Sequence, residues 1–157
     1  MTSKNLMASL PNAIDAEESV IGTVLAYGVE AYEDVQPWIK TENVFYKEIH
    51  QELWKACTSL YKLNNTIDII TVKEKLNEMN LSLINKDDYG AYYLTGLTQN
   101  VIGKSGIVSH AKIVYEKYVQ RQTAISSYSL FDKASDNYKD IQQGLVEHEK
   151  LIDELKS

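Results

Sequence analysis

Cysteine, proline and glycine are all scarce: the 157 residues include one Cys, two Pro and seven Gly. Because Cys57 is the only cysteine, no disulfide can form within the chain, and a single thiol suits a reducing compartment. Pro11 and Pro37 both lie in the first quarter of the chain, so proline interrupts no later helix. Few turn-forming residues beside many Leu, Ile, Lys and Glu favour a helical protein.

Long hydrophobic runs are also missing. No apolar run approaches the roughly 20 residues that span a membrane, and residues 1–10 lack the apolar core of a signal peptide. We therefore expect a cytoplasmic protein with no membrane partner.

Basic residues are too few for a free-standing nucleic-acid-binding protein. Sixteen Lys and Arg face 22 Asp and Glu, which gives a formal net charge of -6. Phosphate contacts need clustered Lys and Arg, so this balance argues against direct binding of nucleic acid by the chain alone.

What is abundant is apolar periodicity at steps of three and four, which predicts an all-α fold. We expect a flexible arm over residues 1–12, a compact globular subdomain of about five helices over 13–106, and a long antiparallel helical hairpin over 107–157. The helices of the globular part are expected at 15–27, 30–39, 46–63, 71–79 and 89–97. The third has the broadest apolar face and should be central, with Cys57 buried on it.

The hairpin helices are expected over 107–134 and about 138–156, joined by a turn at 135–137. Each has an apolar stripe at heptad spacing, typical of helices that pair along a line. The other helix of the hairpin can cover only part of each stripe, so we expect the exposed remainder to be used for self-association. The stripe on the second helix consists of Ile141, Leu145, His148, Ile152 and Leu155.

The first helix has a pattern typical of a capped start. Asp15 followed by Glu18 predicts a capping box, and the adjacent pair Glu17 and Glu18 is interpreted as capping and solvation. Gly22 lacks a side chain, so another helix can approach closely there. Thr71 and Glu74 predict a second capping box, with 67–70 as an extended lead-in.

No motif predicts catalysis, a cofactor or a metal. The histidines His50, His110 and His148 lie on three different predicted helices without metal-ligand spacing, and His50 is interpreted as a hydrogen-bonded structural residue. Gly103-Lys104-Ser105 lacks the earlier glycine and the flanking elements of a P-loop, so it is interpreted as a connector.

Five segments in order give the chain a resemblance to a known family. They are PNAIDAEESVIG (11–22), VFY (44–46) leading into His50, IDIITV (67–72), YLTGL (93–97) and HAKIV (110–114), followed by Gln120-Arg121 and Ile125. In order and spacing the chain resembles the N-terminal domain of bacterial and phage replicative hexameric DNA helicases of the DnaB type.

The resemblance implies a collar-forming domain. In that family hairpins pair between subunits, three dimers build the collar of a hexameric ring, and the collar docks the C-terminal domain of primase. Tyr93, Ile125 and Phe131 match family contact regions. Tyr118 and Arg121 are added from their place in the apolar stripe, where Arg121 suggests a carboxylate or carbonyl across an interface. The full predicted interface is Tyr93, Tyr118, Arg121, Ile125, Phe131, Leu145, His148 and Ile152.

The resemblance stops where the motor of the family would follow. ATP and Mg would be expected only in a C-terminal ATPase domain, and the chain ends at Ser157, where the interdomain linker should begin. We therefore expect no enzymatic activity and no cofactor in this chain. Two alternatives stay open: the helicase-docking domain of a primase, and a free-standing regulator that joins helicase hexamers.

Overall fold

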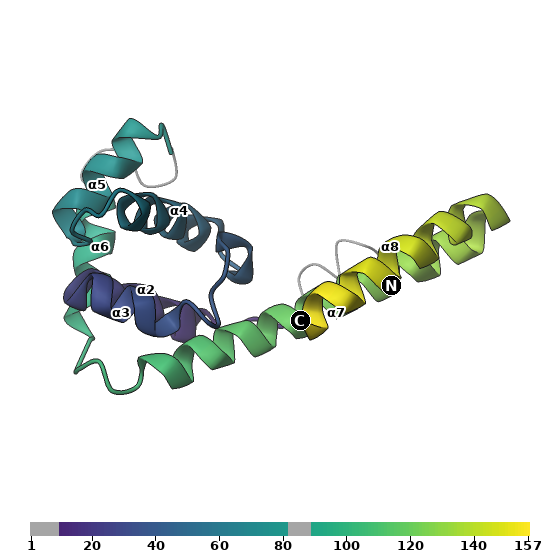
Figure 1. Cartoon of the computed structure of the whole chain (residues 1–157), viewed down its shortest axis with the longest axis horizontal. Helices are drawn as coiled ribbons and strands as arrows, with labels where there is room; N and C mark the ends of the chain where they lie inside the picture. Colours follow the sequence, from purple (N-terminus) through teal and green to yellow (C-terminus); the bar gives the residue numbers. More distant parts are fainter. Residues whose placement is uncertain (1–9, 82–88) are drawn as a thin grey trace. The chain divides into compact units, whose positions relative to one another are not determined.

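The computed structural model describes residues 10–81 and 89–157, and every regular element within these ranges is a helix (Figure 1). The predicted all-α class is confirmed. The described residues form two compact units: residues 13–115, and residues 116–157 together with 10–12. The part of the predicted arm before Leu10 lies outside the described residues.

The helices of the compact unit follow the predicted order. They are α2 (Ile14–Tyr27), α3 (Val29–Val35), the short 3-10 helix η1 (Glu42–Val44), α4 (Glu48–Lys62), α5 (Ile69–Glu78), α6 (Tyr89–Gln99) and the beginning of α7 (Ile107–Asp136). Gly28 ends α2 with a φ of 74°, a left-handed conformation that favours glycine, so the first helix ends at Tyr27 as expected. The second helix is shorter than expected, because α3 ends at Val35 and the chain turns at 36–38, just at Pro37.

Helix α4 is central, as its broad apolar face predicted. It packs against α2, α5 and η1, and its Leu53, Trp54 and Cys57 side chains are buried. The Trp54 ring stacks on Tyr32 of α3, with ring centres 4.9 Å apart. Burial raises the pKa of the Cys57 thiol to about 12, so at neutral pH it is a small core side chain.

The backbones of α2 and α6 approach closely at Gly22. A Cβ atom built on this residue would lie 2.2 Å from the carbonyl oxygen of Leu97, far inside van der Waals contact. The prediction that another helix comes close at Gly22 is confirmed, and α6 is that helix.

Both predicted capping boxes are wrong in detail. Helix α2 begins at Ile14 after Ala13, and no side chain caps it, so Asp15 and Glu18 do not form a box. Helix α5 begins two residues earlier than expected, with Asp68 as its N-cap: the Asp68 carboxylate accepts from the Thr71 backbone N–H at 2.8 Å, and the Thr71 hydroxyl accepts from the Asp68 N–H at 3.0 Å. Only the residues before Ile69 form the extended lead-in.

In the second unit, α7 and α8 (Tyr138–Lys156) run antiparallel, with only Asn137 between them instead of the predicted three-residue turn. The Asn137 side chain caps α8 by accepting from the Asp140 N–H at 3.0 Å. Across the hairpin, Lys133 forms an ion pair with Glu147 at 2.7 Å. The Ser126 hydroxyl and His148 Nδ1 lie 2.5 Å apart.

The face of α8 that packs on α7 differs from the predicted stripe. Gly144 is buried, and a Cβ there would lie 3.0 Å from Cδ of Lys133 and 3.3 Å from Cδ1 of Leu130. Leu145 and Ile152, which the stripe included, are 54% and 38% exposed. Ile141, His148 and Leu155 of the predicted stripe are half-buried. At the other two positions the prediction is one residue off, because Gly144 and Leu151 take the inner places that it gave to Leu145 and Ile152.

Over the described ranges, none of the helices combines the length and the apolar character needed to cross a bilayer.

Candidate functional site

A buried acid lies at the centre of the compact unit. Glu17 of α2 is 1% exposed. Its Oε2 accepts from the Tyr46 backbone N–H at 2.7 Å, and its Oε1 accepts from the Lys47 N–H at 3.3 Å. These N–H groups lie just before α4, so a carboxylate from one helix satisfies the free donors at the start of another.

The same carboxylate binds a buried histidine. His50 Nδ1 lies 2.7 Å from Oε1 of Glu17, and His50 is 0% exposed. His50 Nε2 lies 2.7 Å from the Tyr93 hydroxyl of α6. The interpretation of His50 as a hydrogen-bonded structural residue is confirmed, and the chain Glu17–His50–Tyr93 joins α2, α4 and α6.

The geometry defines the direction of these hydrogen bonds. A carboxylate oxygen only accepts, so His50 Nδ1 donates. Burial, followed by the nearby Glu18 and Glu17, raises the pKa of Tyr93 to about 12, so the phenol keeps its proton at neutral pH. In a neutral ring, Nε2 of His50 then accepts from the Tyr93 O–H. Among the described residues, no buried side-chain N or O atom lacks a hydrogen-bond partner.

Glu17 corrects the interpretation of the acidic pair as capping and solvation. Glu17 is in the core, whereas Glu18, one position on, is only partly buried. The sequence signal that could have revealed this is the buried stripe of α2: Glu17 precedes Val20, Ile21 and Val24 at helical spacing and so lies on their face.

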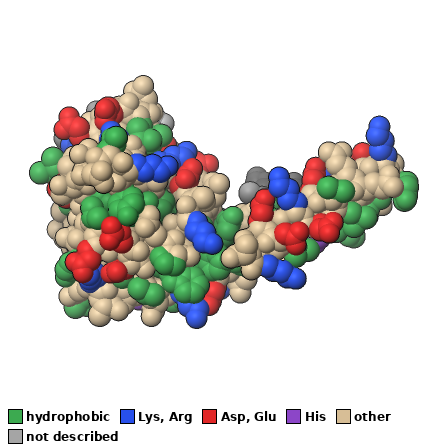
Figure 2. Space-filling view, in the orientation of Figure 1, with side chains coloured by type: hydrophobic (Ala, Val, Ile, Leu, Met, Phe, Trp, Pro, Cys, Tyr) green, Lys and Arg blue, Asp and Glu red, His purple; other side chains and the backbone are tan. Residues whose placement is uncertain are grey.

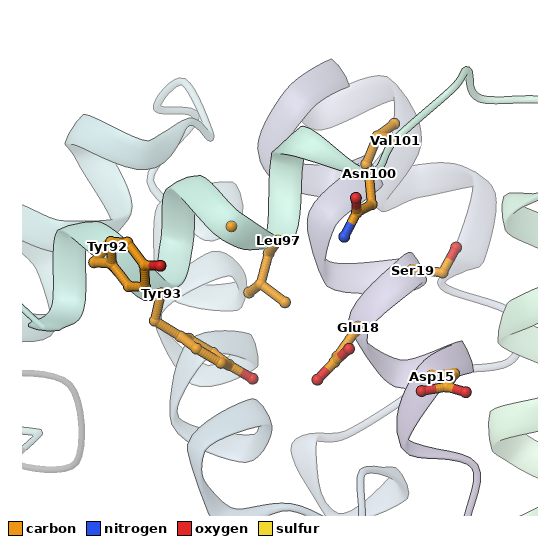
Figure 3. A pocket seen from close by; sticks show the side chains of 9 residues that line it. Asp15, Glu18, Ser19, Tyr92, Tyr93, Leu97, Asn100 and Val101 are labelled. Atoms are coloured by element: carbon orange, nitrogen blue, oxygen red, sulfur yellow. The ribbon is translucent and has the colours of Figure 1, made fainter.

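A cavity of about 350 Å³ lies beside this network, between α2 and α6. Asp15, Glu18 and Ser19 of α2 line one side, and Tyr92, Tyr93 and Leu97 of α6 line the other. Figure 3 shows the Tyr93 hydroxyl and the Glu18 carboxylate pointing toward the same space from the two helices. The network holds Tyr93 by its hydroxyl, so the core positions one wall of the cavity.

Two further contacts fasten the connector and the start of α7. The Ser19 hydroxyl lies 2.7 Å from His110 Nδ1, a pair that sequence reasoning did not predict. Lys104 forms ion pairs with Glu30 and, at 3.5 Å, with Asp34, and the hydrogen bond to Glu30 raises the pKa of Lys104. The lysine thus binds carboxylates of α3, as suits a structural connector.

In the hairpin unit, Arg121 contacts its own chain. It is 5% exposed, and its Nη1 donates to the Pro11 carbonyl oxygen at 3.0 Å. The guanidinium also lies 5.9 Å from the ring centre of Tyr118, which is half-buried. A carbonyl partner was one of the two predicted, but it comes from the same chain.

The other predicted interface residues divide into two groups. Ile125 and His148 are half-buried and line a cavity of about 200 Å³ between α7 and α8. Phe131, Leu145 and Ile152 are 71%, 54% and 38% exposed. Tyr138, which the prediction omitted, is 76% exposed and lies seven residues before Leu145. Figure 2 shows hydrophobic side chains at the surface of the hairpin beside acidic ones.

Tyr93 is the one predicted interface residue in the compact unit. The other predicted interface residues belong to the hairpin unit. Within the described residues, no three His, Cys, Asp or Glu side chains are grouped so that they could hold a metal ion.

The fold matches that of a solved structure. The structure is similar to the crystal structure of the N-terminal domain of DnaB helicase from Mycobacterium tuberculosis, with a TM-score of 0.79 and 24% sequence identity over 89% of this chain and 98% of that one.

The sequence comparison identifies the family. The sequence model of the family "DnaB-like helicase N terminal domain" matches residues 9–116, so the chain belongs to this family. It is 30% identical over 112 residues to the replicative DNA helicase DnaB of Pasteurella multocida, covering 71% of this chain and 23% of that protein. It is 27% identical over 146 residues to the DnaB of Rhodothermus marinus, covering 91% of this chain and 15% of that protein. The chain therefore spans less than a quarter of the length of these two relatives.

Proposed function

We propose that this chain acts as the non-catalytic N-terminal domain of a replicative DNA helicase in the cytoplasm, where it builds the ring collar by pairing of hairpins and docks primase. One observation carries the proposal: a member of this family exposes large apolar side chains along its hairpin. ATP and Mg would bind in a separate ATPase domain, and DNA would be contacted only indirectly.

The exposed apolar groups are arranged for pairing. Tyr138, Leu145 and Ile152 are spaced by seven residues, so they lie along one side of α8. The opposite ends of the row are separated by 14 residues, about 21 Å along a helix, which is enough for several layers of side chains. In a two-fold dimer, a second hairpin would place its own row against this one, so that both rows would be buried. Three such dimers would form the collar.

We expect Leu145→Asp to dissociate this dimer. The leucine is half exposed in one chain, so the substitution leaves the fold of the hairpin intact, but each dimer would bury two new carboxylates. The dimer dissociation constant should rise at least about 100-fold, since two sites each lose more than about 1.4 kcal/mol. Sedimentation equilibrium measures this.

The matched control is Lys150→Asp, which places a carboxylate on the other side of α8, at an exposed position. It should change the dissociation constant less than about threefold. A wild-type chain that stays monomeric at the highest soluble concentration would refute pairing through the hairpin, and so would equal effects of the two substitutions.

For primase, the proposed contacts are Tyr93, Ile125 and Phe131. Phe131 is the most exposed of the three, and truncating a large aromatic anchor typically costs a factor of about ten or more in affinity. We expect Phe131→Ala and Tyr93→Ala each to weaken binding of the C-terminal domain of the cognate primase, as measured by titration calorimetry.

Val146→Ala is the control for this titration, because Val146 is an exposed apolar residue of α8 outside the Tyr138–Leu145–Ile152 row. Unchanged primase affinity in the Tyr93→Ala, Phe131→Ala double variant would contradict the docking proposal. That result would leave the dimer measurement unaffected.

A further inference from the structure

The cavity between α2 and α6 has two chemically different sides. From α2 come the carboxylates of Asp15 and Glu18, and from α6 come the rings of Tyr92 and Tyr93 and the side chain of Leu97 (Figure 3). Among the described residues that line it, none is a lysine, arginine or histidine. A cavity with acid on one side and aromatic and apolar groups on the other matches a cation attached to an apolar stem.

The two carboxylates are available for such a cation. Neither Asp15 nor Glu18 forms an ion pair with a described residue, whereas Glu17 between them uses its carboxylate fully in the core. Asp15 is exposed and Glu18 is partly buried, so an incoming charge meets one carboxylate at the rim and one inside. Glu18 also contributes to the raised pKa of Tyr93, which agrees with a short separation between the two groups.

The aromatic side is also held ready. Tyr93 is fastened by its hydroxyl to His50 at 2.7 Å, so its ring is fixed before anything binds. Tyr92 is 82% exposed, which is unusual for a large ring in a folded domain and gives it freedom to cover a bound group. A ring fixed beside two carboxylates suits a planar guanidinium, which stacks on aromatic faces and donates to carboxylates from its edge.

We propose that this cavity binds the cationic side chain, preferentially of arginine, of a segment from a partner protein. The guanidinium lies between Glu18 and the Tyr93 ring, Asp15 receives it at the rim, and an apolar neighbour of the arginine rests on Leu97. The volume of about 350 Å³ supports this size of occupant, because it is at the small end of ligand cavities and holds one or two side chains. The proposal deepens the proposed docking role of Tyr93 and rests on it for the choice of a protein partner, but its peptide test is separate from the dimer and primase measurements.

The test is a titration of the ¹⁵N-labelled chain with the capped tripeptide acetyl-Leu-Arg-Leu-amide, followed by NMR. We expect saturable shifts of the backbone amides of Ser19, Gly96 and Leu97, with a dissociation constant on the order of 1 mM, as fits one stacked and paired side chain. The same peptide with citrulline, which keeps the shape but has no charge, should bind at least about fivefold more weakly. The lysine peptide should fall between the two.

Variants separate the charge from the cavity itself. Glu18→Gln should weaken the arginine peptide about fivefold or more, whereas Glu48→Gln, which removes the same charge at an exposed position outside the cavity, should change binding less than about twofold. Equal binding of the arginine and citrulline peptides would overturn the proposal and indicate an apolar pocket only. Shifts confined to other surfaces, or no shifts at all, would also overturn it.

Discussion

Glu17→Gln is expected to lower the free energy of unfolding by about 3 kcal/mol, although it changes only an oxygen to an amide nitrogen. The carboxylate accepts three hydrogen bonds, from the Tyr46 N–H, the Lys47 N–H and His50 Nδ1, at 2.7, 3.3 and 2.7 Å. A glutamine has one accepting oxygen, and its NH₂ group would face a donor at the other position. At 1% exposure no water reaches the site to relieve that conflict.

Urea denaturation followed by circular dichroism measures this loss, with Glu18→Gln as the control. Glu18 is the next residue on the same helix, is only partly buried and accepts none of these hydrogen bonds, so its substitution should cost less than about 0.5 kcal/mol. A loss below about 1 kcal/mol in Glu17→Gln would mean that the buried hydrogen bonds contribute little net stability.

The buried network of Glu17, His50 and Tyr93 also positions a wall of the surface cavity. His50 receives its orientation from Glu17 and holds the Tyr93 hydroxyl, and the Tyr93 ring lines the cavity between α2 and α6. A change at Glu17 therefore moves a group that is proposed to meet a partner, although Glu17 itself cannot touch one. The buried hydrogen bonds of the core thus determine the position of a side chain in the candidate site.

The course of the helices could be predicted because local chemistry determines it. Apolar spacing located α4 as the central helix, and the absence of a side chain at Gly22 predicted a close neighbour. Where a prediction depended on which polar group a side chain would find, it failed. Glu17 has the same sequence neighbours as a capping residue, but its partners are Tyr46 and Lys47, just before α4, and His50 on α4, about 30 residues away in sequence.

The hairpin shows a second limit of sequence reasoning. Two adjacent rows on α8 have heptad spacing, one through Ile141, His148 and Leu155 with Gly144 and Leu151 beside it, the other through Tyr138, Leu145 and Ile152. Hydrophobicity favours Leu145 over Gly144 for the inner face. Packing reverses the choice, because Leu130 and the stem of Lys133 already fill the space opposite Gly144. The larger side chains are therefore left outward, where a second chain could cover them.

Gly22→Ala is expected to destabilise the compact unit by about 2 kcal/mol, although alanine is the better helix former. The new Cβ would lie 2.2 Å from the carbonyl oxygen and 2.9 Å from the carbonyl carbon of Leu97, and 3.2 Å from Cγ2 of Val101. Two of these atoms belong to backbone, so α6 must move away from α2. The movement outweighs the gain of about 1 kcal/mol that alanine brings to a helix interior.

Gly96→Ala in α6 is the matched control, because a Cβ there meets nothing within 4 Å. This variant should gain about 0.5–1 kcal/mol from helix propensity alone, so the two substitutions of the same kind on facing helices should differ by about 3 kcal/mol in urea denaturation. If Gly22→Ala were as stable as Gly96→Ala, the two helices would not be in backbone contact. The cavity wall formed by Tyr93 and Leu97 would then not be held at a fixed distance from Glu18, since α2 and α6 carry the two sides.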